Sequence, residues 1–280
     1  MSEYRFISAK SVEDATSILS NEGETSCLTA GTTNILTDIR YGRRKPCLLV
    51  DISRIKELAG ITFDGTKVRI GSLTTIAEIA SSSLIEELAP ALADAAQHFA
   101  DPVTRNRATI GGNIAHASPA ADSAPPLLCF DAEVLISSVD GCRRVPVCDF
   151  FLGVNKTSLT SSEIITAFEF LPCKDSAFIK VGLRNAMAIS VASVAVAINK
   201  DSNGCIERCR IAFGSLAPRP VRAYNTEKLL CGKKPDTAIT EEVKAAILKD
   251  ISPIDDIRAT REYRISVAET ILERALVKEQ

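Results

Sequence analysis

The chain has 280 residues, of which 46% are hydrophobic and 24% charged, as is typical of a globular protein whose core needs no disulfide bonds. Its formal net charge of −2 gives no electrostatic reason to expect binding to nucleic acid or to an anionic membrane. The N-terminus has no apolar signal segment, and the longest apolar run, Ile189–Ile198, is far shorter than the roughly 20 residues that span a bilayer. We therefore expect a cytoplasmic protein without a membrane span.

Nine cysteines are scattered along the chain, and none of them forms a CxxC pair. Cys205 and Cys209 are close in sequence, but no second pair and no nearby histidine completes a four-ligand site. An odd number of cysteines without a signal segment favours reduced thiols. We expect structural cysteines, no metal site and no iron–sulfur cluster in this chain.

The first 50 residues predict an alternation of helices and short strands. Ser11 is expected to cap a helix that Gly23 ends, and a short apolar strand follows at Cys27 and Leu28. The loop Ala30-Gly31-Thr32-Thr33-Asn34 comes next and leads into a helix over Ile35–Arg40. A buried strand is predicted at Cys47–Val50.

Alternation over Thr66–Gly71 predicts a strand, Thr74–Ser81 is helical in spacing, and Pro90 suits the first residue of another helix. The stretch Val103–Pro126 has almost no periodicity, although it is neither polar nor of low complexity. Long irregular stretches inside a compact domain usually carry function. We expect a functional loop there.

Strands predominate after Glu133 and give way to a helix near the C-terminus. A turn signal at 200–204 predicts a hairpin, and residues 265–276 keep helical spacing. The fold class is therefore α+β, with a mixed N-terminal half and a C-terminal half in which strands precede helices. The expected strands are Val134–Ser137, Ile164–Phe170, Phe178–Leu183, Val191–Ile198 and Arg208–Gly214.

Common catalytic and nucleotide-binding motifs are absent. The chain has no GxGxxG, no GxxxxGK[ST], no HExxH and no GxSxG, and its only histidines are His98 and His116. Hydrolase and zinc-enzyme functions therefore lack the residues they need. We assign no catalytic side chain.

Two glycine-containing loops remain as candidate ligand-binding elements. In the first, Gly31 lies between a strand and a helix, where free backbone N–H groups and short polar side chains suit a phosphate. In the second, Thr109-Ile110-Gly111-Gly112-Asn113, paired glycines allow the backbone to approach a bulky ligand closely. Asp122 follows and could accept a hydrogen bond from a ribose or ribityl hydroxyl. Each loop alone could be a tight structural turn, whereas together they favour an anionic, nucleotide-like ligand.

The segment Arg105–Ile114, followed by Ala117–Asp122, closely resembles the second FAD loop of the molybdenum hydroxylase flavoproteins, the medium subunits of carbon monoxide, xanthine and nicotinate dehydrogenases. The first loop resembles the other FAD loop of that family. The resemblance continues over nearly the whole chain, at residues 182–190, 214–220, 256–259 and 263–264.

The resemblance implies a two-part FAD-binding domain of the vanillyl-alcohol-oxidase (PCMH) type at 1–173, with subdomains of about 1–55 and 56–173. A C-terminal α+β domain at 176–280 would consist of an antiparallel sheet followed by helices. FAD would be held noncovalently, and a covalent link to His116 is not expected. The implied cofactor-binding residues are Ala30, Gly31, Thr32, Thr33, Asn34, Phe99, Thr109, Ile110, Gly111, Gly112, Asn113, Asp122, Ile165 and Lys180. Phe99, Ile165 and Lys180 could instead serve only in packing or at the surface.

The implied function is electron transfer in a heterotrimer. A large molybdopterin subunit would oxidise the substrate, a small subunit with two-iron two-sulfur clusters would pass electrons to this FAD, and NAD or another acceptor would receive them. A stand-alone flavin oxidase and a non-catalytic nucleotide-binding assembly factor are the alternatives.

Four features depart from the family pattern, and one of them is His116, which stands where asparagine is common. Thr32 replaces a usual glycine, so it must adopt a negative φ or tolerate strain. Asn34 replaces a frequent Asp or Ser. Residues 185–188, Asn-Ala-Met-Ala, lack the acidic residues of some NAD-reducing relatives, which leaves the electron acceptor open. We expect the first loop to bind the cofactor less firmly than the second.

Overall fold

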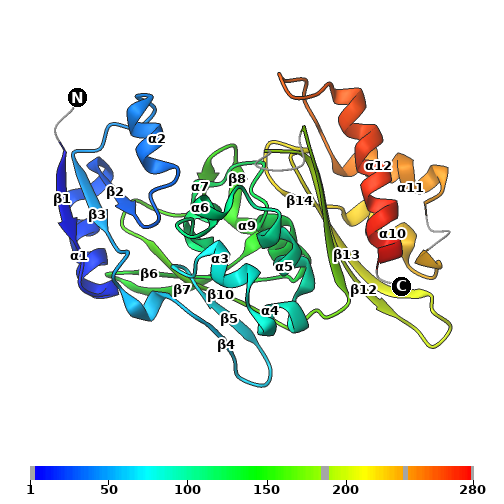
Figure 1. Cartoon of the computed structure of the whole chain (residues 1–280), viewed down its shortest axis with the longest axis horizontal. Coiled ribbons are helices and arrows are strands. Elements are labelled where there is room, and N and C mark those ends of the chain that lie inside the picture. Colours follow the sequence, from blue (N-terminus) through cyan, green and yellow to red (C-terminus); the bar gives the residue numbers. More distant parts are fainter. Residues whose placement is uncertain (1–3, 184–188, 236–238, 279–280) are drawn as a thin grey trace.

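A computed structural model describes residues 4–183, 189–235 and 239–278. The chain forms three parts in sequence order: a small N-terminal unit, a central unit and a C-terminal unit built around a sheet (Figure 1). The sequence predicted many of the longer elements of these units and missed many of the short ones.

The N-terminal unit is a parallel sheet of order β1-β3-β2, with Leu19, Leu48 and Val50 in its core. Ser11 caps the first helix by accepting from Asp14 N, and Gly23 ends that helix with φ of 62°. The strands are β1 (Arg5–Ser8), β2 (Ser26–Thr29) and β3 (Leu48–Asp51), and the helices are α1 (Val12–Glu22), the 3-10 turn η1 (Gly23–Thr25) and α2 (Ile35–Arg40).

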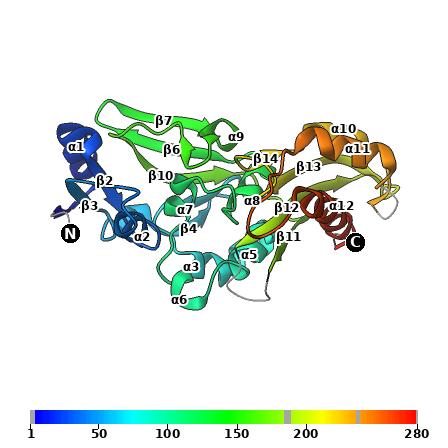
Figure 2. The same ribbon diagram turned by 90° about the horizontal axis from the view of Figure 1, so that it is seen from above.

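The central unit is an antiparallel sheet of order β4-β5-β10-β6-β7, with helices packed against it (Figure 2). Strand β7 was not predicted, because it is an exposed edge strand whose Cys-Arg-Arg sequence shows no apolar alternation. The strands are β4 (Ile61–Phe63), β5 (Val68–Gly71), β6 (Glu133–Ser138), β7 (Gly141–Pro146), β8 (Phe151–Gly153), β9 (Lys156–Thr157) and β10 (Ile164–Phe170). The helices are η2 (Lys56–Leu58), α3 (Ile76–Ala80), α4 (Ser83–Leu88), α5 (Pro90–Gln97) and α9 (Val147–Phe150).

The stretch 103–126 is not the irregular loop that its sequence predicted. It contains most of α6 (Pro102–Arg105), all of α7 (Ile110–His116) and the start of α8 (Ala124–Cys129). These helices are too short to show a 3.6-residue period, and α6 and α7 are defined instead by their capping residues, Asp101 and Thr109.

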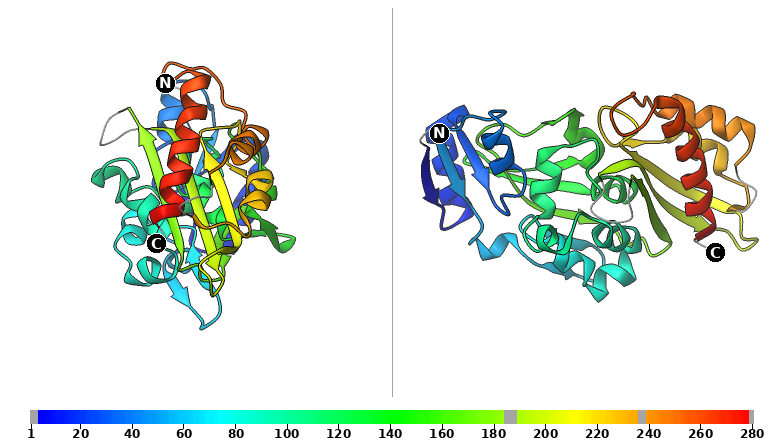
Figure 3. Two further views of the ribbon diagram at one scale, coloured as in Figure 1. Left: turned by 90° about the vertical axis from the view of Figure 1, so that its right-hand side faces the viewer. Right: turned by 45° about the horizontal axis from the view of Figure 1, so that its top comes forward.

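The C-terminal unit is a four-stranded antiparallel sheet of order β11-β12-β13-β14 (Figure 3). One face presents small side chains, such as Ala195 and Ala212, to α5 and α8, while Val194 and Ile211 on the other face pack under the C-terminal helices. Because both faces are buried, residues 191–198 of β12 are apolar apart from Ser193 and do not alternate with polar ones. The elements are β11 (Ser176–Gly182), β12 (Ser190–Lys200), β13 (Ile206–Gly214), β14 (Val221–Arg222), α10 (Tyr224–Leu230), α11 (Glu241–Asp250) and α12 (Arg261–Lys278).

Within the described ranges, no helix combines the length and the apolar character needed to cross a membrane. The longest helix, α12, has 18 residues and carries charged side chains along its length.

Candidate functional site

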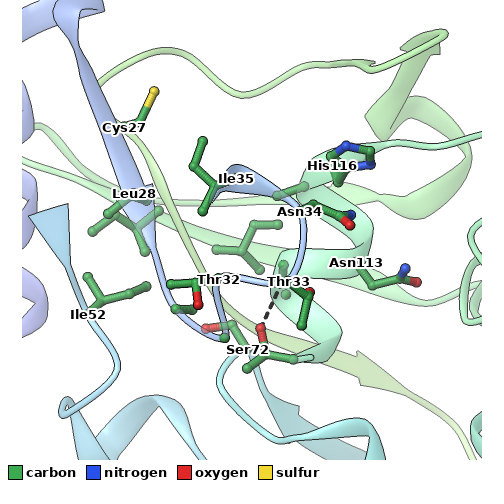
Figure 4. A pocket seen from close by; sticks show the side chains of 18 of the residues that line it. Cys27, Leu28, Thr32, Thr33, Asn34, Ile35, Ile52, Ser72, Asn113 and His116 are labelled. Carbon is green, nitrogen blue, oxygen red and sulfur yellow. Dashed lines mark hydrogen bonds between the residues drawn. The ribbon is translucent and has the colours of Figure 1, made fainter. Parts of the chain in front are cut away.

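A cavity of about 660 Å³ lies between the N-terminal and central units and is lined by both glycine loops. Its volume falls within the roughly 300–1,000 Å³ of most small-molecule sites. Figure 4 shows Thr32 and Thr33 of the first loop around the same space as Asn113 and His116 of α7. Eleven of the fourteen predicted site residues line it: Ala30, Gly31, Thr32, Thr33, Asn34, Phe99, Thr109, Gly111, Gly112, Asn113 and Ile165.

The first loop leaves its backbone donors free. Chain direction reverses between β2 and α2, and the N–H groups of residues 31–34 donate to no acceptor among the described residues. Backbone N–H groups without a partner inside the protein are available to a ligand or to water. Four such donors at one turn suit an anionic group such as a phosphate.

The backbone N–H groups of the second loop are hydrogen-bonded to acceptors within the protein. Ile110 N donates to Thr74 O at 3.0 Å, Gly111 N to Ser72 O at 2.8 Å, and Gly112 N to Thr109 Oγ1 at 3.1 Å. A Cβ on Gly111 would lie 2.7 Å from Ser72, so this glycine permits a close contact within the protein and not with a ligand. Gly112 is exposed and lines the cavity, and its Cβ would meet Thr109 Oγ1 alone.

The two units touch directly where the loops meet. A Cβ on Gly31 would lie 1.7 Å from Arg107 O, which leaves no room for any side chain. Arg107 also donates to Gly31 O and to Thr32 Oγ1, both at 3.3 Å. Arg107 therefore fixes the first loop against the segment that leads into α7.

Three predicted residues do not line the cavity. Ile110 is fully buried in the central core. Lys180 of β11 places its Nζ 2.5 Å from Asp122 Oδ2 and 3.2 Å from His98 O. The side chain of Lys180 is 8% exposed, so it is not a solvated surface lysine, and it joins the C-terminal unit to the central one.

Known proteins share this architecture over the whole chain. The family described as "FAD binding domain in molybdopterin dehydrogenase" matches residues 2–172, and the family described as "CO dehydrogenase flavoprotein C-terminal domain" matches residues 177–278. The chain belongs to the FAD-binding medium subunits of the molybdenum hydroxylases. The resemblance and the fold class predicted from the sequence are thereby confirmed.

Two relatives and one solved structure illustrate the similarity. The xanthine dehydrogenase FAD-binding subunit of Escherichia coli O157:H7 is 35% identical over 274 residues, which are 96% of this chain and 93% of that protein. The carbon monoxide dehydrogenase medium chain of Hydrogenophaga pseudoflava is 31% identical, over 98% of this chain and 96% of that protein. A solved carbon monoxide dehydrogenase structure from the same organism matches with a TM-score of 0.92 at 31% identity, covering 98% of this chain and 96% of that chain. The chain is thus a dehydrogenase flavoprotein subunit.

The cavity of this medium subunit fits FAD. The free N–H groups of the first loop suit its diphosphate, and exposed Gly112 lies on the opposite wall without a side chain. Ser72, which the sequence did not single out, also lines the cavity, and its buried hydroxyl has no partner. An orphaned buried hydroxyl next to a cavity matches a ligand with many hydroxyl and carbonyl groups. No motif points to Ser72, because it lies in an ordinary strand-to-helix turn.

Thr32 adopts φ of 61°, in the left-handed region. The sequence allowed either a negative φ or a strained backbone at this residue, and the structure has the strained backbone. A β-branched residue in the left-handed region is destabilised by about 1–2 kcal/mol. Thr32→Gly is expected to raise the free energy of unfolding by up to about 1 kcal/mol, since the greater entropy of glycine in the unfolded chain offsets part of the gain.

The matched control for Thr32→Gly is Thr33→Gly, at a neighbouring exposed position without a positive φ. It should lower stability by roughly 0.5–1 kcal/mol. Chemical denaturation of both variants provides the measurement, and equal destabilisation by the two would contradict the assigned strain.

Asp122 is buried, and its Oδ1 has no partner among the described residues. Burial raises the pKa of this carboxyl to about 6, and Lys180 opposes the rise only in part. Between about pH 4 and pH 6 the folded protein therefore keeps a proton that the unfolded chain has lost, so the contribution of Asp122 to stability falls as pH rises.

Asp122→Asn is expected to remove this pH dependence. Between pH 4 and pH 7 the free energy of unfolding of the wild type should fall by roughly 3 kcal/mol relative to that of the variant. Urea titrations at several pH values measure the difference. A difference that stays constant with pH would show that the carboxyl titrates normally.

The family motifs in the C-terminal unit support the site without lining the cavity. Ser215 N donates to Pro119 O at 2.8 Å, and a Cβ on Gly214 would lie 3.1 Å from Pro125. The 214–220 segment therefore packs on the turn that carries Asp122. Of the motif at 182–190, residues 184–188 lie outside the described residues, and the whole Asn-Ala-Met-Ala segment at 185–188 falls among them.

All nine cysteines are free thiols, and burial raises the pKa of the Cys129 and Cys209 thiols. In the portion of the chain that the structure describes, no three His, Cys, Asp or Glu side chains are grouped as metal ligands.

Proposed function

We propose that this chain is the electron-transfer subunit of a multi-subunit molybdenum hydroxylase and passes electrons from a partner iron–sulfur subunit to NAD or another acceptor. The cavity between the two glycine loops, with its four free N–H donors, carries the proposal. The relatives support it, since they are FAD-binding or medium subunits of xanthine and carbon monoxide dehydrogenases. Molybdopterin and two-iron two-sulfur clusters would belong to a large and a small partner subunit.

Several of the predicted residues have a direct role in this proposal, whereas Ile110 and Gly111 only support the second loop from within the protein. The backbone of residues 31–34 binds the diphosphate, while Gly112, Asn113 and the Ser72 hydroxyl form the facing wall. Phe99 and Ile165 contact the flavin end, and the Asp122–Lys180 pair closes the site behind it. FAD, when bound noncovalently, supplies the reversible uptake of electrons, and the protein holds and orients it.

The division into domains at 1–173 and 176–280, with subdomains of about 1–55 and 56–173, is part of the proposal. The two matched family ranges, 2–172 and 177–278, support the division at 173–176. A cytoplasmic location and the absence of nucleic-acid partners also remain proposals, consistent with the net charge of −2.

Purification distinguishes this proposal from its alternatives. A yellow protein with a flavin spectrum that co-purifies with a molybdenum subunit and an iron–sulfur subunit is the expected result. A yellow protein that oxidises its own substrate with oxygen would indicate a stand-alone oxidase. A protein that stays colourless after FAD is added would indicate an assembly factor and exclude both flavin functions.

Gly112→Val tests the cavity directly. The new Cβ would lie 2.9 Å from Thr109 Oγ1, so the capping side chain must shift slightly, and the rest of the valine fills space facing the cofactor. FAD content should therefore fall at least about tenfold. Flavin absorbance per protein and the circular dichroism spectrum measure the two effects. Normal flavin content in a folded variant would exclude this wall from the site.

A further inference from the structure

His116 and Asp38 join the two walls of the cavity. His116 is the last residue of α7, and its Nε2 lies 3.5 Å from Asp38 Oδ2 on α2. Both residues line the cavity, and both are largely shielded, with 24% and 12% of their side chains exposed. Asn155 Nδ2 approaches His116 from the β8–β9 turn, where it donates to the backbone oxygen of His116 at 2.9 Å and lies 3.5 Å from the ring Nδ1.

Of the charged groups around the cavity, His116 is the one whose protonation can respond to a bound anion. Among the described residues that line the cavity, Arg44 and His116 alone carry basic groups. Asp38 already faces Arg43 at 3.4 Å and Arg44 at 4.0 Å. Glu163, the other acidic lining residue, is paired with Arg143.

The geometry places His116 close to the proposed diphosphate site. Asn34, the last of the free N–H donors, precedes Asp38 by one helical turn, which corresponds to about 6 Å along α2. On α7, exposed Gly112 and His116 are four residues apart and share the face toward the cavity. Figure 4 shows the side chains of His116 and Asn34 on the same side of the space. The charge of a diphosphate at the first loop would therefore act on the imidazole without being screened out by salt.

We propose that His116 is a cofactor-binding residue that takes up a proton when the diphosphate of FAD enters the cavity, forming a charged bridge between Asp38 and the phosphates. The proposal rests on the proposed function, because it requires FAD in this cavity. Without an anion, burial lowers the pKa of His116, and the positive charges of Arg44 and Arg43 lower it further. The Asp38 carboxylate acts in the opposite direction and raises it. A diphosphate bound at the first loop should raise that pKa, because a nearby negative charge favours the charged imidazole. FAD then binds more tightly at lower pH, because proton and FAD binding reinforce each other.

The chain offers a clean observable, since it contains two histidines. His98 does not line the cavity and serves as the internal control, with Nδ1 2.8 Å from Asp94 O. Nuclear magnetic resonance titration of the two imidazoles, in FAD-free and FAD-loaded protein, measures each pKa. His116→Asn and His98→Asn assign the signals. The pKa of His116 is expected to rise by at least one unit on FAD loading, and that of His98 by much less.

Equilibrium binding of FAD between pH 6 and pH 8.5 provides the second measurement. Wild type and His98→Asn should lose at least about fivefold in affinity across this range, whereas His116→Asn should change less than twofold. A pH-independent affinity of the wild-type chain, or the same pH dependence in His116→Asn, would overturn the inference while leaving the proposed function intact. No FAD binding at any pH would overturn the proposed function and the inference with it. Flavin that remains with acid-precipitated protein would instead show a covalent bond and would also overturn it.

Discussion

Gly31→Ala is expected to abolish FAD binding, with affinity reduced at least about a hundredfold. The new methyl group would lie 1.7 Å from the carbonyl oxygen of Arg107, a distance that no rotamer change can relieve because both groups belong to the backbone. The N-terminal and central units must move apart, which displaces the four free N–H donors from the facing wall. Fluorescence titration of FAD-free protein measures the loss.

Gly153→Ala is the matched control for the Gly31 variant. A Cβ at this position meets nothing within 4 Å, and its backbone has no positive φ. FAD affinity should therefore change less than twofold, and stability should change little or rise slightly. Near-normal FAD binding by the Gly31 variant would show that the two units can separate without damage to the site.

Arg264→Ala is expected to lower the free energy of unfolding by about 3–5 kcal/mol, one of the largest effects of a single substitution in this chain. Arg264 is 3% exposed and donates to Val191 O at 2.6 Å and to Ser215 O at 3.1 Å, while its other nitrogen lies 2.7 Å from Asp256 Oδ1. Its removal leaves two buried carbonyl groups without this donor and takes one of several donors from the Asp256 carboxylate, which Arg258 N and Ala259 N still contact. Because Ser215 holds the turn that carries Asp122, FAD content should fall as well.

Arg258→Ala provides the comparison, since Arg258 pairs with the same carboxylate at 2.9 Å but is 36% exposed. A half-exposed pair contributes at most about 1 kcal/mol, so this variant should remain close to wild type in stability. Urea denaturation of both variants measures the difference. Equal effects would mean that Arg264 acts only through its charge and not through the carbonyl groups it satisfies.

Short-range patterns in the sequence predicted the element order well. Ser11 and Gly23 bound α1 as expected, Ile35–Arg40 is a helix with the predicted ends, and β10 has the predicted bounds. These features depend on caps, periodicity and turn residues, which act over a few positions and can be recognised locally. The family assignment followed from the Arg105–Ile114 and Ala117–Asp122 segments in the same way, because their motifs are contiguous.

The tertiary structure decided which backbone and side-chain groups of the two loops remain available to a ligand. The sequence predicted that both glycine loops hold the cofactor and that the contact of the first loop is the less secure, yet the free N–H donors belong to the first loop and Gly111 packs against Ser72. The burial of Lys180 beside Asp122 and the contact of His116 with Asp38 join residues 58 and 78 positions apart. Hydrogen-bond satisfaction, backbone strain and charge pairing depend on which distant segments meet, so no local pattern encodes them. The sequence by itself thus determined the family and the cofactor class, and only packing determined how each residue serves the site.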